Sequence, residues 1–582
     1  MNKQNIDKSI LKKAQSWLDG NYDITTKKQV KNLLENNINE LNDAFYKDLE
    51  FGTGGLRGIM GVGTNRMNKY TVGIATQGLA NYLKKIYTDK KQIKIAIAYD
   101  CRNNSAFFAR TAADVLAANK FKVYLFDELR PTPELSFAVR YLKCNAGIVI
   151  TASHNPKEYN GYKVYWNDGG QLVPPHDKNI IEQVEKIKNI NDVNFNGKSK
   201  YIEIIGKNID DKYLKRIKEL SLSKNIIKKH KYLKIVYTSI HGTGIKLVPQ
   251  SLKNFGFRDV YIVDKQCIVD GNFSTVKSPN PEEPEALSLA IKRAKQVDAD
   301  LVMATDPDGD RVGIAVKNYE NKFVLLNGNQ IASLLIYYLI NKWKNDRKLK
   351  GKEYIVKTIV TTELLKDIAD KNNVECFDVL TGFKYIAEVI KQNEDKKTFI
   401  GGGEESYGYL MGDFVRDKDA VISCSMIAET CAWAIHKDKT LYDLLADIYF
   451  EYGFYKERLM YIVKKGKSGS EKIQEMMKNY RDNPMLSINN SDVVVIKDYL
   501  TQTEKNFVDG TEKPLKKLLK SNVIQFFLKD KTKITVRPSG TEPKIKYYFS
   551  VKTNLEDKAR FEETNKILEK KIDDVISSMG LR

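Results

Sequence analysis

The sequence has few of the features that mark a secreted or membrane-spanning protein. It holds only 6 cysteines among 582 residues, none in a C-x-x-C pair, and its 5 histidines form no metal-ligand spacing with them. A disulfide scaffold is therefore disfavoured, and reduced, buried thiols are expected. The most apolar stretches, such as residues 332–340, are far below the ~20 residues that a membrane span needs. The first residues lack an apolar signal region. We expect a cytoplasmic protein with no membrane partner.

Acidic residues are in short supply relative to basic ones, since 74 Asp and Glu face 95 Lys and Arg, a net charge of +21. Only 17 of the basic residues are arginine, and the lysines are scattered among acids rather than gathered in one block. A nucleic-acid partner is therefore not expected, although a basic nucleic-acid-binding protein stays a rival interpretation. The basic background suits an anionic small substrate, which it attracts over long distances.

The length suggests about four domains, and 42% apolar with 29% charged residues lets each domain bury a core. Apolar runs that read as buried strands alternate with helical patterns. The strand-like runs are residues 93–99, 121–126, 146–150, 233–237, 260–263, 301–304, 354–360 and 398–400, and residues 104–119 give the first clear helix. Over the last ~130 residues, predicted helices at 470–480 and 555–577 frame short strands. The prediction is three similar mixed α/β domains and a C-terminal α+β domain, covering residues 1–208, 209–325, 326–455 and 456–582.

Three carboxylates alternate directly after one predicted strand, in the order Asp306, Asp308 and Asp310, with Arg311 next. Like charges this close repel unless a cation lies among them. Their hard oxygens suit Mg²⁺ or Ca²⁺. An EF-hand is excluded, because Gly309 stands at loop position 4 rather than 6 and Lys317 replaces the final Glu. Three protein oxygens leave room on a metal for a phosphoryl oxygen.

Ser153 lies where another predicted strand ends and a polar turn, Thr151–Pro156, begins. A serine in such a turn is often only a turn former. The G-x-S-x-G elbow of ordinary esterases is absent, so Ser153 needs another means of activation.

Three further loops carry polar or charged groups. The Gly-rich segment 401–408 contains two acids and a hydroxyl, and cations follow it at residues 416–418. The turn at 535–544 combines an arginine with hydroxyls, which suits a phosphate. The segment 51–58 is rich in glycine, but Arg57 stands at the sixth position of G-x-G-x-x-G, so a dinucleotide site is rejected.

These segments, in this order, resemble the α-D-phosphohexomutase superfamily over nearly the whole chain. Thr151–Pro156 resembles its phosphoserine loop, and the segment from Asp306 to Arg311 its Mg²⁺ loop. Gly403–Ser406 resembles the sugar-binding loop of the superfamily, and Arg537–Thr541 resembles its phosphate-binding loop. Thr381–Lys384 is similar to a second sugar-contacting loop, and Asn160–Lys163 to the segment with a basic residue near the phosphoserine. Asn65–Asn68 and Ser278–Pro284 look like the longer branch, which includes α-phosphoglucomutases, phosphopentomutases and sugar-bisphosphate synthases.

The resemblance implies a fold of four domains in a heart shape and a role for each matched residue. Ser153 would carry a phosphoryl group and, with Asp306, Asp308 and Asp310, form the metal site for Mg²⁺. The implied catalytic residues are Ser153, His154, Lys163, Arg57 and Arg311. Among them, Lys163 and Arg57 are the candidates to handle the proton of the sugar hydroxyl, for which an arginine needs an unusual environment. The implied substrate-binding residues are Thr53, Thr381, Gly382, Lys384, Glu404, Ser406, Lys418, Arg537, Ser539, Gly540 and Thr541.

The resemblance further implies a monomeric or weakly dimeric enzyme that acts on a hexose phosphate. The expected reaction interconverts glucose 1-phosphate and glucose 6-phosphate, with glucose 1,6-bisphosphate as intermediate and activator. Phosphomannomutase or phosphopentomutase activity is an alternative. A more distant one is a metal-dependent phosphatase, which shares the aspartate loop but needs no phosphate anchor.

Overall fold

The computed structural model describes residues 7–52, 54–89, 92–464, 466–515, 518–539 and 544–581. The chain divides into two compact units. Unit 1 comprises residues 1–326, 390–394 and 407–436, and unit 2 comprises residues 327–389, 395–406 and 437–582. Thr53, Gly540 and Thr541, three of the predicted substrate-binding residues, lie outside the described residues.

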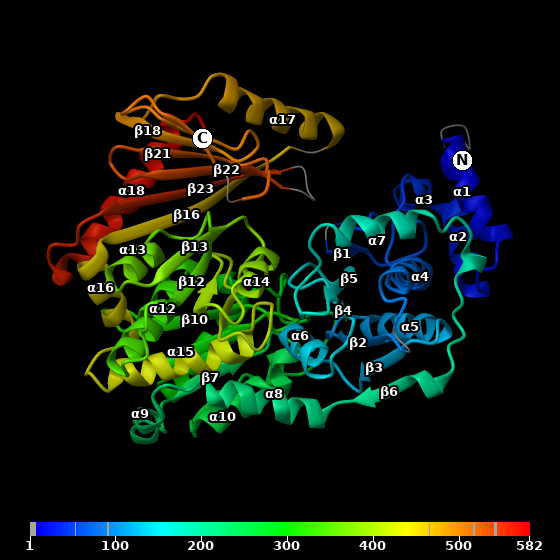
Figure 1. Ribbon diagram of the computed structural model, residues 1–582, viewed down its shortest axis with the longest axis horizontal. Helices are drawn as coiled ribbons and strands as arrows, with labels where there is room; N and C mark the ends of the chain where they lie inside the picture. Colours follow the sequence, from blue (N-terminus) through cyan, green and yellow to red (C-terminus); the bar gives the residue numbers. More distant parts are fainter. Residues whose placement is uncertain are drawn as a thin grey trace. The chain divides into compact units, whose positions relative to one another are not determined.

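Strands and helices alternate along much of unit 1, except for the three helices at its start and the consecutive strands within residues 146–166 and 301–326 (Figure 1). Its strands are β1 Gly55–Ile59, β2 Lys94–Tyr99, β3 Lys122–Phe126, β4 Ala146–Ile150, β5 Tyr159–Trp166, β6 Ile202–Ile205, β7 Ile235–Thr238, β8 Val260–Ile262, β9 Leu301–Thr305, β10 Val312–Lys317, β11 Phe323–Leu326 and β15 Tyr409–Met411. Its helices are α1 Lys8–Asp19, α2 Ile24–Asn36, α3 Ile38–Phe45, α4 Lys69–Ile86, α5 Ser105–Ala118, α6 Thr132–Tyr141, α7 His176–Glu185, α8 Lys207–Glu219, α9 Lys224–Lys229, α10 Val248–Phe255, α11 Pro284–Val297 and α15 Ala420–Ile435.

The first sheet of unit 1 has six strands in the order β1-β5-β4-β2-β3-β6, with β2, β3, β4 and β6 parallel. Its isoleucines pack against α4 and α5 in one buried cluster. Gly147 lies on the other face, where α6 packs so closely that a Cβ would meet Val139 at 2.5 Å. Helices therefore cover both faces. Because parallel neighbours end at the same edge, the chain leaves β2 and β4 at adjacent points, with Tyr99 paired to Ile150.

The helices α1, α2 and α3 form a separate cluster around Trp17 and Phe45, which Tyr70 of α4 joins. This N-terminal extension is therefore packed onto the first sheet's helix layer rather than detached.

The second sheet of unit 1 has the order β11-β10-β9-β7-β8. Strands β7, β8 and β9 are parallel, and β10 returns antiparallel beside β9. The turn from β9 to β10 holds residues 306–311, so the three aspartates lie at the carboxyl edge of the parallel strands.

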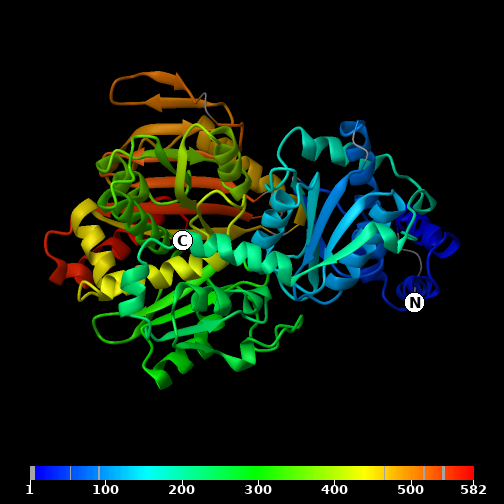
Figure 2. The ribbon, with the colours of Figure 1, turned by 60° about the horizontal axis from the view of Figure 1, so that its bottom comes forward.

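Unit 2 contains a parallel α/β part and a C-terminal sheet. The parallel strands β12 Glu353–Thr358, β13 Glu375–Val379 and β14 Thr398–Gly403 lie in the order β13-β12-β14. The C-terminal sheet runs β16-β23-β22-β21-β18-β19-β20, with β17 beside β18 and the β19–β20 hairpin at its end (Figure 2). Its strands are β16 Phe454–Val463, β17 Ser487–Ile488, β18 Ser491–Asp498, β19 Thr503–Asn506, β20 Glu512–Pro514, β21 Ile524–Leu528, β22 Lys533–Pro538 and β23 Lys544–Thr553. The helices are α12 Gly328–Asn345, α13 Leu364–Lys371, α14 Phe383–Gln392, α16 Leu441–Tyr452, α17 Gly466–Asp482 and α18 Phe561–Ser578.

The predicted α/β class and the different C-terminal part are confirmed, and β4 has the predicted bounds. Two details differ. The glycines at 401–403 continue β14 instead of opening a loop. The reason is close packing against the neighbouring strand: a Cβ on Gly402 would lie 2.3 Å from the Val356 carbonyl oxygen, so only glycine fits there. The last helix begins at Phe561 rather than 555, after a 3₁₀ turn that Asp557 caps. The boundaries at 208, 325 and 455 stay a prediction. In the described part of the chain no helix is long and apolar enough to cross a membrane.

Candidate active site

Ser153 lies just past the carboxyl end of β4 and is 5% exposed. Its φ of 52° is in the left-handed region, which non-glycine residues seldom adopt outside tight turns. The Thr151 hydroxyl stabilises this turn by accepting a hydrogen bond from the Ser153 amide at 2.8 Å. The Ser153 hydroxyl donates to Asp306 Oδ2 at 3.0 Å and lies 3.2 Å from His154 Nδ1. The predicted nucleophile and the predicted metal loop are thus in direct contact.

Arg102, from the turn after β2, holds the serine turn in place. Its guanidinium donates to the carbonyl oxygens of Ser153, Asn155, Pro156 and Tyr159. A buried carboxylate, Asp100, lies 3.3 Å from Arg102 Nε and balances its charge. Removing one partner of such a pair leaves a buried charge, which typically costs about 3–5 kcal/mol. The serine turn is therefore rigidly supported.

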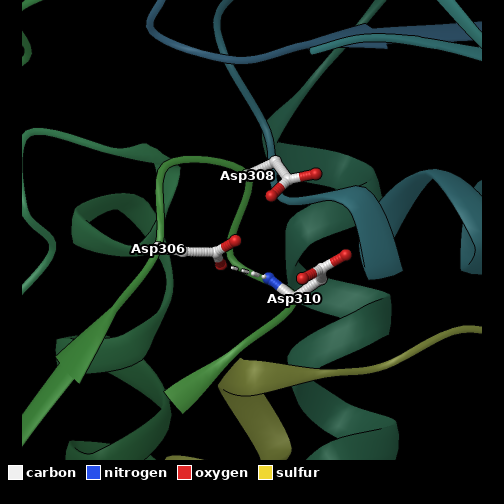
Figure 3. A group of neighbouring side chains, drawn as sticks. All are labelled: Asp306, Asp308 and Asp310. Atoms are coloured by element: carbon white, nitrogen blue, oxygen red, sulfur yellow. Dashed lines mark hydrogen bonds between the residues drawn. The ribbon is translucent and has the colours of Figure 1, made fainter. Parts of the chain in front are cut away.

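Asp306, Asp308 and Asp310 bring one carboxylate oxygen each to within 4.8 Å of one another, and all three are buried (Figure 3). Asp306 Oδ1 accepts from the amides of Asp310 and Arg311 at 3.0 Å, which fixes the turn. Burial and the two neighbouring carboxylates raise the pKa of Asp306 well above its usual range. Oδ1 of Asp308 and Oδ1 of Asp310 are buried and have no hydrogen-bond partner among the described residues. Hard, clustered oxygens with unused acceptor capacity fit a divalent cation.

Two lysines offset part of this negative charge. Lys163 Nζ, from β5, lies 2.8 Å from Asp308 Oδ2 and 3.8 Å from Asp310 Oδ2. Lys418 Nζ lies 3.1 Å from Asp310 Oδ2. Although burial favours its neutral form, the two carboxylates raise the pKa of Lys163, so it is a cation at neutral pH. Burial by itself would raise the pKa of Asp308, but Lys163, a hydrogen bond with Asp306 and Lys418 together lower it below its usual range.

The other predicted catalytic residues of unit 1 lie around this cluster. Burial, with help from Arg311 and Arg57, lowers the pKa of His154 well below its ordinary value, so its ring is neutral. Arg57 Nη1 lies 3.5 Å from Asn155 Oδ1 in the serine turn. Arg311 Nη1 donates to Glu282 Oε1 at 2.7 Å, and its Nε is 3.8 Å from Asp310 Oδ1. The predicted site residues of unit 1 that the structure describes are thus brought together: Ser153, His154, Arg57, Lys163, Asp306, Asp308, Asp310, Arg311 and Lys418.

The predicted sugar-binding residues of unit 2 form a second group. Glu404 Oε1 accepts from the Gly382 amide at 2.9 Å, which joins the 381–384 turn to the end of β14. Beside it, Glu405 Oε2 accepts from Thr358 at 3.2 Å and Thr361 at 3.4 Å. Burial and Glu404 raise the pKa of Glu405 to about 7. Lys384, in the first turn of α14, and Ser406, in the turn after β14, are partly exposed.

Arg537 lies at the end of β22, where Lys546 of β23 pairs with it. Ser539 follows, and its amide donates to the Lys544 carbonyl at 2.8 Å. Arg537 also contributes to the charge around Glu405, whose pKa it lowers. Arg537 Nε is buried without a hydrogen-bond partner in the described ranges, as is Thr381 Oγ1. Buried donors left unpaired are where a ligand's oxygens are accommodated.

The chain matches three domain profiles of the phosphoglucomutase/phosphomannomutase family: alpha/beta/alpha domain I over residues 48–191, domain II over 211–320 and domain III over 327–452. The chain belongs to this family. Its relatives include a phosphoglucomutase of Staphylococcus haemolyticus (strain JCSC1435), 40% identical over 512 residues, 87% of this chain and 91% of the relative. A phosphoglucomutase of Staphylococcus aureus (strain MRSA252) is 40% identical over 520 residues, 88% and 91% of the two chains.

Among solved structures, the phosphoglucomutase pp63/parafusin from Paramecium, in its open form, matches with a TM-score of 0.66. It is 17% identical, and the match covers 91% of this chain and 96% of that one. At this identity the match shows the fold alone. It agrees with membership of the phosphoglucomutase/phosphomannomutase family and with the predicted superfamily.

Several residues that support the site were missed from the sequence. Arg102 holds the serine turn, Thr132 Oγ1 donates to Asp308 Oδ2 at 3.1 Å, and Asp417 accepts from Lys418. For Arg102 the sequence does offer a signal, because the pair Asp100-x-Arg102 follows directly after a predicted strand. Nothing local marks Thr132, whose partner is 176 residues away.

Proposed function

We propose that this chain is a phosphoglucomutase that interconverts glucose 1-phosphate and glucose 6-phosphate through a phosphoserine at Ser153. The observation that carries the proposal is the Ser153 hydroxyl 3.0 Å from Asp306 Oδ2, within a buried cluster of carboxylates and lysines. Relatives 40% identical over most of the chain bear the same name, which supports the choice of sugar.

The proposed metal is Mg²⁺, held by Asp306, Asp308 and Asp310 with an oxygen on Ser153. The unpaired Oδ1 atoms of Asp308 and Asp310 support this, because buried acceptors without donors suit a cation. When bound, Mg²⁺ would neutralise charge on the phosphoryl oxygens. Lys163 and Lys418, within 2.8 and 3.1 Å of the aspartates, supply further positive charge. Phosphoryl transfer depends chiefly on such charge and on positioning.

In the proposed step the bond from phosphorus to Ser153 Oγ breaks and a bond to a sugar hydroxyl oxygen forms. The sugar hydroxyl loses its proton and Oγ gains one, so the net charge of the site is unchanged. The His154 ring is a neutral proton acceptor 3.2 Å from Oγ, and we assign the proton exchange to it. This differs from the expectation that Lys163 or Arg57 handles the proton: the carboxylates of Asp308 and Asp310 raise the pKa of Lys163, so we assign it the role of a cation, and Arg57 likewise. The product is glucose 1,6-bisphosphate, whose other phosphate returns to Ser153 in the second half-reaction.

Unit 2 supplies the proposed substrate contacts. Glu404 and Ser406, with Thr381, Gly382 and Lys384, are assigned to the sugar hydroxyls. Arg537 and Ser539, with Gly540 and Thr541 outside the described residues, are assigned to the phosphate that is not transferred. The unpaired Arg537 Nε and Thr381 Oγ1 support these assignments. Cytoplasmic location and a monomeric or weakly dimeric state stay predictions.

A coupled assay tests the function. The protein, with Mg²⁺ and glucose 1,6-bisphosphate, is given glucose, mannose, ribose and glucosamine phosphates, and both sugar-phosphate isomers and free phosphate are measured. We expect the highest kcat/KM for glucose 1-phosphate and a weaker one for mannose 1-phosphate. A preference for ribose phosphate would move the protein to the phosphopentomutases. Release of phosphate without isomerisation would identify a phosphatase.

A further inference from the structure

The segment Ser278–Pro284 has no role in the proposed reaction, yet it ends beside the metal loop. Glu282 Oε1 accepts from Arg311 Nη1 at 2.7 Å, while Arg311 Nε is 3.8 Å from Asp310 Oδ1. The Arg311 guanidinium is thus flanked by two carboxylates, one from the metal loop and one from this segment. An arginine held by two acids has much less rotational freedom than a lone one.

The position of Glu282 is fixed by its own turn. Asn280 organises this turn, because its side-chain oxygen accepts from the Glu282 amide at 3.2 Å and its carbonyl from the Glu283 amide at 3.0 Å. Pro281 lies inside the turn, and Pro284 begins α11. Helix α11 in turn packs through Ala286 and Leu287 into the core of the second sheet. The carboxylate is therefore carried on a rigid support.

Gly313, two residues after Arg311, leaves the space that the Asn280–Glu283 turn occupies. A Cβ on Gly313 would lie 2.2 Å from the Pro281 carbonyl oxygen, a distance that no side chain permits. Gly313 pairs with Ala304 in the β9–β10 ladder, so it cannot move away from the turn without disturbing the metal loop. The bare backbone at 313 brings the Asn280–Glu283 turn against β10, beside Arg311.

We propose that Glu282 is a positioning residue for the reaction, which holds the Arg311 guanidinium beside Asp310 and thereby orients a cation for the transferring phosphoryl group. The inference rests on the proposed function. Glu282 itself needs no contact with substrate. The turn that carries it has a catalytic purpose, which explains why a partly exposed loop residue is held so firmly.

The matched pair Glu282→Gln and Glu283→Gln tests this. Glu283 is exposed and adjacent, so its variant controls for the loss of one charge at this turn. We expect Glu282→Gln to lower kcat by roughly 10- to 100-fold, the usual result of displacing a catalytic group slightly. KM for glucose 1-phosphate should change little and thermal melting should match that of Glu283→Gln, because the ion pair is partly exposed. Equal kcat in the two variants would overturn the proposal.

A double-mutant cycle with Arg311→Lys separates positioning from a merely structural role. If Glu282 acts through Arg311, the double variant should lose no more than the worse single variant. If the kcat of the double variant fell by the product of the two single-variant losses, the inference would be refuted. The variant Gly313→Ala provides an independent test. It keeps the charges of Glu282 and Arg311 but displaces the Asn280–Glu283 turn. It should lower kcat, and adding Glu282→Gln to it should do no further harm. A wild-type protein and Glu283→Gln variant that isomerise no sugar phosphate would instead contradict the proposed function.

Discussion

The serine-and-aspartate cluster of unit 1 and the proposed recognition loops of unit 2 are built in different ways. In unit 1 the side chains are hydrogen-bonded or ion-paired to one another: Ser153 to Asp306, Lys163 to Asp308, Lys418 to Asp310. The buried atoms of this cluster that lack a hydrogen-bond partner among the described residues, Oδ1 of Asp308 and of Asp310, are acceptors. In unit 2, Arg537 Nε and Thr381 Oγ1 are buried with no hydrogen-bond partner among the residues described. The first arrangement is typical of preorganised electrostatics. The second leaves donors for a ligand to satisfy.

This difference predicts different kinetic consequences. Changes in the cluster of unit 1 should reduce kcat, since its groups are proposed to act on the phosphoryl group as charge is redistributed. Changes in the loops of unit 2 should chiefly raise KM, because contacts with parts of the substrate that do not react stabilise ground state and transition state alike.

The largest effect is expected for Ser153→Ala, which removes the proposed phosphoryl acceptor. Mutase turnover should fall by at least about 10⁴-fold, as for other nucleophiles that act within a catalytic unit. Alanine has the same backbone requirements at φ 52°, so the fold should persist. Intact-protein mass spectrometry after incubation with glucose 1,6-bisphosphate measures the phosphoserine. Phosphorylation elsewhere in an active Ser153→Ala protein would contradict both the role of Ser153 and the contrast between the units.

The next largest effect is expected for Asp308→Asn. Loss of a buried carboxylate should weaken the metal and reduce kcat by about 10³-fold, since metal charge contributes several kcal/mol to phosphoryl transfer. Chelation should stop the wild-type enzyme, and Mg²⁺ should restore it. Asp298→Asn is the matched control, because Asp298 is an exposed aspartate of the same unit paired with Lys317. Full activity in excess chelator would show that the cluster works without a metal.

A smaller effect, on a different parameter, is expected for Arg537→Ala. A charge-assisted contact of about 1.5–3 kcal/mol corresponds to a rise of about 10- to 150-fold in KM for either sugar phosphate. Poor anchoring should also release more bisphosphate, so the variant should need more added glucose 1,6-bisphosphate than the parent. Arg560→Ala, at an exposed pair with Glu563, is the control in unit 2. An unchanged KM with identical activator curves would place the anchor elsewhere.

The sequence predicts best those features whose residues are close together in the chain. Asp306, Asp308 and Asp310 are within five residues, so one strand end and simple charge repulsion suffice to predict the metal cluster. Ser153 is predicted by the end of β4, which is a clear apolar run. The glycines at 401–403 mislead, because glycine signals a turn as readily as a close approach of two backbones.

Contacts over long separations were not predictable from the local pattern. Arg102 reaches a carbonyl 51 residues away and Lys163 an aspartate 145 residues away, and only the packed sheets bring them together. The role of Glu282 could not be predicted for the same reason. The sequence marks its segment only as resembling the longer branch of the superfamily, whereas its contact with Arg311 depends on the close approach of the Pro281 carbonyl oxygen to Gly313.

The smallest effect concerns the pH dependence of unit 2. Burial beside Glu404 raises the pKa of Glu405 from an ordinary 4.5 to about 7. The folded protein therefore keeps a proton that the unfolded chain releases above pH 4.5, and stability falls as the pH rises from about 4.5 to 7. Above pH 7 both states are ionised and the penalty is constant. A glutamine side chain at this position has no proton to lose, so Glu405→Gln should escape this penalty.

Thermal melting of wild type and Glu405→Gln from pH 4.5 to 8.5 measures the difference. The melting temperature of the variant relative to wild type should rise by a few degrees across pH 4.5–7 and then stay level. The exposed Glu556→Gln, also in unit 2, should show no such trend. A parallel pair of curves for Glu405→Gln and wild type would mean that Glu405 is already ionised at pH 5. The contrast between the two units would then rest on the unpaired donors of Thr381 and Arg537 alone, since the unpaired oxygens of Asp308 and Asp310 in unit 1 are acceptors.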